Sequence, residues 1–346
     1  MKPLTGIRVV EIAALGPLEH AGMMLADLGA EVIRIVRTPS IGPTNPIHRG
    51  RTTRVLNLKE PADLEQALAL IASSDVLLEG MRPGAMERLG LGPDEIARHN
   101  PGIVYGRMTG WGQTGPLAPR AGHDINYIAE TGALASIVGA EGRPAVPLNL
   151  IGDFGGGALY LVVGVLASLL QRDRSGVVID AAIVDGVSSL LQCVRGLAAV
   201  GEWTEQTGGN LLDGGRPWYD VYRCLDGKYM AVGALEPQFY EQLLHGLGLA
   251  PTQMPDRDDP ENWPVIRNRL TEAFARRTRD EWAEILGALD ACATPVLSLR
   301  EAEESPHLLA RGSLQSTAEG PSTAPAPRLS RLTPTPVTDS TEHAPS

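Results

Sequence analysis

Two stretches of the chain contain the residue types that proton transfer needs. A Gly-rich loop with a tryptophan, Gly110 to Pro116, leads to His123 and Asp124, which directly precede an apolar helical pattern. Asp153 precedes a second such pattern, Ala158 to Leu170. Both groups are therefore expected at or near helix N-termini, where unpaired N–H groups and the helix dipole favour negative charge. An acid/base pair beside such a dipole suits proton abstraction next to a carbonyl.

Each of these residues also fits a purely structural role. Asp124 and Asp153 have the residue type of helix N-caps, and His123 alone would be an ordinary surface residue. The preceding loop favours a site, because a Gly-rich loop with a tryptophan is costly to order. Glycines flank Asp153 in Gly152 to Gly157 and let a ligand approach the backbone. We therefore interpret His123 and Asp153 together as a candidate site.

Four cations and one further carboxylate complete the candidate residues. Arg37, Lys59, Arg82 and Arg88 fall at or just after the ends of predicted strands, or early in the next element. At that edge of an open α/β sheet ligands bind, and several cations there would suit phosphates and a diphosphate. Taken singly, each cation fits solvated surface charge better than a binding role. Glu236 precedes a proline that opens a helix, where a carboxylate complements the dipole.

The order of elements predicts an α/β fold with a doubly wound, Rossmann-like parallel sheet. A strand at 7–12, a helix at 18–28 and a strand at 31–36 form a βαβ unit, and further strands are expected at 54–58, 76–79, 104–108 and 177–181. The turn after the first strand lacks G-x-G-x-x-G, so a nicotinamide dehydrogenase is disfavoured. A helix is expected at 183–200. We predict a large α/β domain at 1–200, a linker at 201–218, and a smaller α+β domain at 219–302. Residues 303–346 are expected to return to the large domain and to end in a partly disordered tail.

Composition excludes several classes of function. The net charge of −11 disfavours a nucleic-acid partner. Three separated cysteines share no metal-ligand spacing and suit a reducing, cytoplasmic location. HExxH, P-loop and GxSxG motifs are absent, and no signal peptide is expected because the first residues lack an apolar run before the first strand. The apolar run Ala158 to Leu170 is too short to span a bilayer, so no membrane partner is expected.

At these motifs the sequence resembles the CaiB/BaiF family, the type III CoA transferases, and within it the α-methylacyl-CoA racemases. The resemblance covers nearly the whole chain. Its most specific segments are Arg107 to Pro116, Gly122 to Tyr127 and Leu148 to Gly157, and it persists at Glu236 to Tyr240.

The resemblance implies roles for individual residues. His123 and Asp153 would be the two proton-transfer groups, and Glu236 would hydrogen-bond the histidine from the small domain of the other subunit of an interlocked homodimer. CoA would be bound by a set of positions along the large domain: Arg37, Leu58, Lys59, Gly80, Arg82, Arg88, Gly122, Asn126 and Tyr127. CoA would arrive as part of an acyl-CoA substrate of fatty acid metabolism, with no separate cofactor and no metal.

Two activities and one inactive alternative remain open. A racemase would move the α-proton of a 2-methylacyl thioester between His123 and Asp153. A type III CoA transferase would instead use Asp124 as nucleophile. A degenerate member would bind acyl-CoA without turnover, which the presence of His123, Asp153 and Glu236 disfavours. Nothing in the sequence selects the acyl group.

Overall fold

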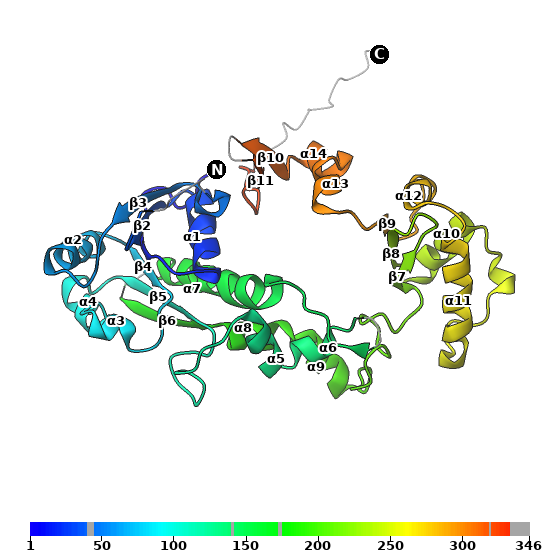
Figure 1. The fold of residues 1–346 in the computed structure, drawn as a ribbon, viewed down its shortest axis with the longest axis horizontal. Coiled ribbons are helices and arrows are strands. Elements are labelled where there is room, and N and C mark those ends of the chain that lie inside the picture. Colours follow the sequence, from blue (N-terminus) through cyan, green and yellow to red (C-terminus); the bar gives the residue numbers. More distant parts are fainter. Residues whose placement is uncertain (40–44, 140–141, 172–174, 318–319, 333–346) are drawn as a thin grey trace, which may run out of the picture.

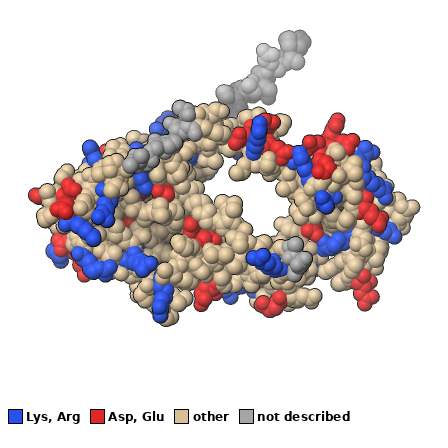
Figure 2. Space-filling view, viewed as in Figure 1, with Lys and Arg blue, Asp and Glu red and all other residues tan. Residues whose placement is uncertain are grey.

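The computed structural model describes residues 1–39, 45–139, 142–171, 175–317 and 320–332. A large lobe and a small lobe are joined on two sides, and the space-filling surface is open between them (Figures 1 and 2). The expected disordered tail lies outside the described residues.

The large lobe is built on a six-stranded sheet with the order β3-β2-β1-β4-β5-β6. Every neighbouring pair is parallel, which confirms the predicted Rossmann-like fold class. The strands are β1 (Arg8–Ile12), β2 (Glu31–Val36), β3 (Arg51–Val55), β4 (Val76–Glu79), β5 (Val104–Thr109) and β6 (Val177–Ala182). The strand predicted at 54–58 is β3, which begins and ends three residues earlier than predicted. Because β3 lies at the sheet edge with a mostly exposed, polar sequence, it carries no apolar run that marks its start.

Helices cover both faces of the sheet, and each face has its own core. Leu25 of α1, Ile128 of α5, Leu161 of α7 and Val187 of α8 belong to one core. The other core contains Ile71, Met86 and Ile96 from α2, α3 and α4. These helices are α1 (Pro17–Asp27), α2 (Pro61–Ala72), α3 (Ala85–Arg88), α4 (Pro93–His99), α5 (Asp124–Glu130), α7 (Leu159–Leu169) and α8 (Ile183–Leu190), with the short α6 (Ala133–Ser136) after α5.

The helix containing Asp153 begins earlier than predicted. A π-helical segment, Leu150–Ala158, continues directly into α7, so Asp153 lies inside the first turn rather than before the helix. Its glycines permit close packing on α8: a Cβ added at Gly156 would lie 2.6 Å from Val187. The run Leu150–Leu169 is therefore 20 residues long and apolar enough to cross a membrane by length and composition, with 39% of its apolar 18-residue window buried. The helix is thus longer than the sequence predicted and not too short to span a bilayer, although the core helix of a globular protein passes the same test.

The helix expected at 183–200 is divided. α8 ends at Leu190, and α9 (Gln192–Ala199) follows after Leu191. No helix or strand occurs in residues 201–218, all of which the structure describes.

The small lobe packs helices on an antiparallel sheet ordered β7-β8-β9. A separate core joins its elements, which are β7 (Tyr219–Arg223), β8 (Tyr229–Gly233), β9 (Ala293–Pro295), α10 (Pro237–Leu247), α11 (Trp263–Phe274) and α12 (Arg279–Gly287). Gly246 lies inside α10 and does not cap it. A Cβ there would lie 2.5 Å from Leu286, so contact with α12 requires the glycine, and Gly248 (φ 70°) caps the helix.

The C-terminal segment runs from the small lobe back beside the large one (Figure 1). It contains α13 (Leu299–Glu303), α14 (Pro306–Arg311) and the hairpin of β10 (Leu314–Thr317) and β11 (Gly320–Thr323). Arg49 of the large lobe donates to Thr323 Oγ1 at 3.4 Å. The domain bounds given above stay predictions.

Candidate active site

His123 is the N-cap residue of α5. Its backbone N–H donates to Asn126 Oδ1 at 3.0 Å, which fixes the start of the helix, and its imidazole is exposed. Asn126, predicted to bind CoA, thus has a capping role in the structure. The result is an imidazole held at a helix N-terminus and open to a ligand.

Asp124 joins the two candidate proton-transfer elements. Its side chain is buried, and Oδ2 accepts the backbone N–H of Asp153 at 2.6 Å. Gly152 makes this approach possible, because a Cβ there would lie 2.3 Å from Asp124 Oδ2. The other oxygen, Oδ1, is buried and has no hydrogen-bond partner among the described residues. Asp124 therefore ties the start of α5 to the helical segment of Asp153.

Asp153 is partly buried beside the turn that follows β1. Asn149 Nδ2 donates to Asp153 Oδ2 at 3.2 Å, and a Cβ added at Gly16 would lie 3.1 Å from the same oxygen. Burial raises the pKa of Asp153; Asn149 opposes the shift, the negative Asp124 adds to it, and His123 opposes it. A carboxyl group with a raised pKa, electrostatically coupled to a histidine, suits proton transfer near neutral pH.

The Gly-rich loop is ordered around Tyr127. The Trp111 and Tyr127 rings meet edge to face, with centroids 4.7 Å apart, and the Tyr127 hydroxyl donates to the Gly122 carbonyl. A Cβ at Gly110 would lie 1.9 Å from the Tyr127 ring, so only glycine permits this contact. The loop is thereby packed against the start of α5.

A cavity of about 210 Å³ reaches the histidine. It lies between the loop after β4 and the Gly-rich loop, and its lining includes Gly80, Arg82, Trp111, Gly122, His123 and Tyr127. Asp153 does not line it, but its backbone is bonded to Asp124, the residue next to His123.

A larger cavity of about 730 Å³ lies at the carboxyl ends of the strands. Arg37, Lys59 and Arg88 line it with Leu58 and Ala13, and Met81 lines both cavities. The site spans the point where the strand order reverses between β1 and β4, the ligand-binding position in such sheets. The predicted CoA residues other than Asn126 thus line one or the other cavity, a cationic one and one that contains His123.

Comparison with known proteins assigns the family. A model described as CoA-transferase family III matches residues 4–346. The chain belongs to this family. Family members with curated descriptions include the α-methylacyl-CoA racemase of Mus musculus, 43% identical over 99% of this chain and 90% of the relative. The α-methylacyl-CoA racemase of Homo sapiens is 42% identical over 94% of this chain and 86% of the relative.

Solved family structures have the same fold. A CAIB/BAIF family protein from Brucella suis superposes with a TM-score of 0.79 at 23% identity, covering 95% of this chain and 93% of its own. Rv3272 from M. tuberculosis gives a TM-score of 0.76 at 27% identity, covering 96% and 94%.

Glu236 is not brought to His123 within this chain. It precedes α10 in the small lobe, whereas α5 belongs to the large lobe and lies below the opening in Figure 1. The Glu236 side chain is exposed, does not cap α10, and has no hydrogen bond or ion pair among the described residues. A carboxylate in this state is available to a group outside its own chain.

Two groups that support the site were not predicted from the sequence. The first is Asn149, whose side-chain amide donates a hydrogen bond to the Asp153 carboxylate. Glu79, fully buried, accepts the Met81 N–H at 2.7 Å and Arg107 Nε at 2.9 Å, and so fixes the loop between the cavities. Burial raises the pKa of Glu79, and its hydrogen bonds from Met81 and Arg107 oppose that shift. The sequence contains one signal for Glu79, which is a charged residue at the end of an apolar strand.

Proposed function

We propose that this protein is a 2-methylacyl-CoA racemase that inverts the α-carbon by proton transfer between His123 and Asp153. The observation that carries the proposal is the Asp124–Asp153 hydrogen bond, which couples the two proton-transfer elements. The racemases at 42–43% identity over nearly the whole chain support it.

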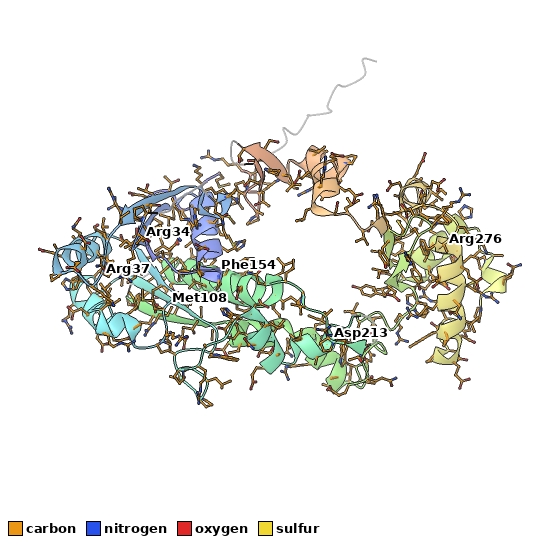
Figure 3. The ribbon with its side chains drawn as sticks, in the orientation of Figure 1. Arg34, Arg37, Met108, Phe154, Asp213 and Arg276 are labelled. Carbon is orange, nitrogen blue, oxygen red and sulfur yellow. The ribbon has the colours of Figure 1, made fainter. Side chains whose placement is uncertain are left out.

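The two cavities suggest how an acyl-CoA would lie. Its phosphates would be held by Arg37, Lys59 and Arg88 in the larger cavity, and its thioester would reach His123 past Met81. In Figure 3, Arg37 lies toward the outer end of the large lobe, and Phe154, next to Asp153, lies nearer the central opening. CoA would thus be part of the substrate, and the chemistry needs no further cofactor.

The proton transfer would use the two groups as acid and base. The α-hydrogen of a thioester is weakly acidic, so its removal requires a base within hydrogen-bond reach and donors toward the developing enolate oxygen. One group abstracts the proton, and the protonated other group returns one to the opposite face. The Asp124 backbone N–H, at the start of α5, would hold the thioester oxygen; one such donor is typically worth about 3 kcal/mol.

The site would be completed in an interlocked homodimer. Glu236 of one subunit would hydrogen-bond His123 of the other, because the two residues lie in different lobes of one chain. Exposed apolar side chains on α7 and α8, among them Val163 (62%) and Leu190 (49%), would be covered by the second copy.

A mixing experiment tests the shared site. His123→Ala and Glu236→Ala subunits are each inactive in the proposal, but refolded together they form mixed dimers with one intact pair. Recovery of activity on mixing supports the shared site, and no recovery despite mixed dimer formation contradicts it.

The activity itself is tested with resolved (2R)- and (2S)-2-methylacyl-CoA. Each epimer should be converted to the other, approaching an equal mixture. A transferase would instead form a covalent acyl intermediate at Asp124, which hydroxylamine traps. Trapping at Asp124 without epimerisation would overturn the racemase proposal in favour of the transferase.

A further inference from the structure

The backbone segment directly before Glu236, Gly233 to Leu235, is fixed by hydrogen bonds through both its N–H groups and its carbonyls. The N–H of Gly233, the last residue of β8, donates to the Cys292 carbonyl at 2.8 Å, and the Ala234 N–H donates to the Trp218 carbonyl at 2.9 Å. The carbonyls on this segment have a different partner. Arg257 donates to the Leu235 carbonyl at 2.8 Å through Nη2, and Nη1 lies 3.5 Å from the Ala234 carbonyl.

Arg257 is itself fixed between aromatic rings. Its guanidinium carbon lies 4.9 Å from the ring centroid of Trp218 and 4.9 Å from that of Tyr240, and both residues are buried. Its own carbonyl accepts Trp263 Nε1–H at 2.9 Å. A planar guanidinium can stack on rings and donate to two carbonyls at once, which a lysine ammonium does less well.

The Glu236 side chain has no such restraint. Its carboxylate is exposed and unbonded among the described residues, so its position depends on the backbone alone. Arg257 makes the shorter of its two hydrogen bonds to the carbonyl of Leu235, the residue directly before Glu236. No other charged side chain among the described residues is hydrogen-bonded to this segment.

We propose that Arg257 is a positioning residue that sets the place of Glu236 for its hydrogen bond to His123 of the partner subunit. The inference rests on the proposed function. The residues proposed to bind CoA lie in the large lobe, so replacing Arg257 should affect proton transfer and leave CoA binding unchanged.

The test compares Arg257→Met, Arg257→Lys and Glu236→Gln in the full-length dimer. Arg257→Met should lower kcat about 10- to 100-fold with KM unchanged, because small misplacements of a catalytic group cost that much. Arg257→Lys keeps the charge and should give an intermediate kcat. Arg269→Met is the matched control: Arg269 also contacts a backbone carbonyl in the small lobe, that of Gln253, and its variant should retain wild-type kcat.

The double variant separates positioning from a general structural defect. In the Glu236→Gln background, Arg257→Met should cause no further loss of kcat.

Wild-type kcat in a folded Arg257→Met or Arg257→Lys dimer overturns the inference, as does a full additive loss in the double variant. If Arg257→Met does not fold, Arg257→Lys decides, and wild-type kcat there overturns the inference. Failure of the proposed function shows differently: wild-type protein that does not epimerise, or Glu236→Gln with unchanged kcat, contradicts it whatever Arg257 does.

Discussion

The carboxylate of Asp124 accepts the backbone N–H of Asp153 at 2.6 Å. One buried side chain thus connects the helix that begins after His123 with the segment that contains Asp153. Because a transferase would need this carboxylate as a nucleophile, its structural role bears on both candidate activities.

Asp124→Asn is the substitution that separates the activities. The amide oxygen can still accept the Asp153 N–H, so racemisation should fall by no more than about tenfold. Asp124→Ala leaves that N–H unsatisfied and should cost about 10- to 100-fold, which makes it a poor discriminator. Rates of epimerisation and of CoA transfer are measured in parallel. Full loss of epimerisation in a folded Asp124→Asn protein would refute the positioning role.

Gly152→Ala should disrupt the same contact. The added Cβ would lie 2.3 Å from Asp124 Oδ2, so the two segments must separate, and kcat should fall about 100-fold. Gly196→Ala, in α9, meets nothing within 4 Å and should leave kcat unchanged while stabilising the helix by about 1 kcal/mol. Steady-state kinetics and thermal unfolding measure both. Equal activities for the two variants would contradict the account.

Asn149→Ala should change the pH dependence. Asn149 donates to Asp153 and thereby lowers the pKa of that carboxyl group, which burial has raised. Removing the donor raises the pKa further. In the direction where ionised Asp153 is the base, activity is lost as pH falls through this pKa, so the acidic limb of kcat/KM should move to higher pH. An unmoved limb, or a move to lower pH, would show that another group controls it.

The cavity cations should act on binding rather than on chemistry. Arg88→Met removes one charged donor from the larger cavity, and KM for acyl-CoA should rise about 10- to 100-fold with kcat unchanged. Arg98→Met, on the exposed side of α4 where Arg98 pairs with Glu95, is the control. Calorimetry with free CoA gives the affinity directly. Unchanged affinity in Arg88→Met would exclude a role in holding phosphates.

The sequence predicts the parallel sheet well because its central strands are short apolar runs separated by amphipathic helices. It predicts the edge strand β3 poorly, since that strand is exposed and rich in Thr and Arg. The sequence did not predict the π-helical start at Leu150, because the glycines of the segment Leu150–Ala158 are typical of a loop. The close packing of Gly156 on Val187 and of Gly152 on Asp124 explains two of these glycines.

The candidate site was predictable in its residue types and less so in its connections. His123, Asp124 and Asp153 stand out beside glycines at expected helix starts. The bond between Asp124 and Asp153, the donor Asn149 and the buried Glu79 depend on contacts across the fold, which no local pattern encodes.

The most direct test of proton transfer between two groups is the early time course in deuterated water. Each resolved epimer of 2-methylacyl-CoA is incubated with the wild-type protein, and the deuterium at the α-carbon of both epimers is measured before equilibrium. With His123 and Asp153 on opposite faces, the newly formed epimer should contain deuterium while the remaining starting epimer contains almost none. Absence of deuterium from both epimers, or equal labelling of both from the first turnover, would contradict the account.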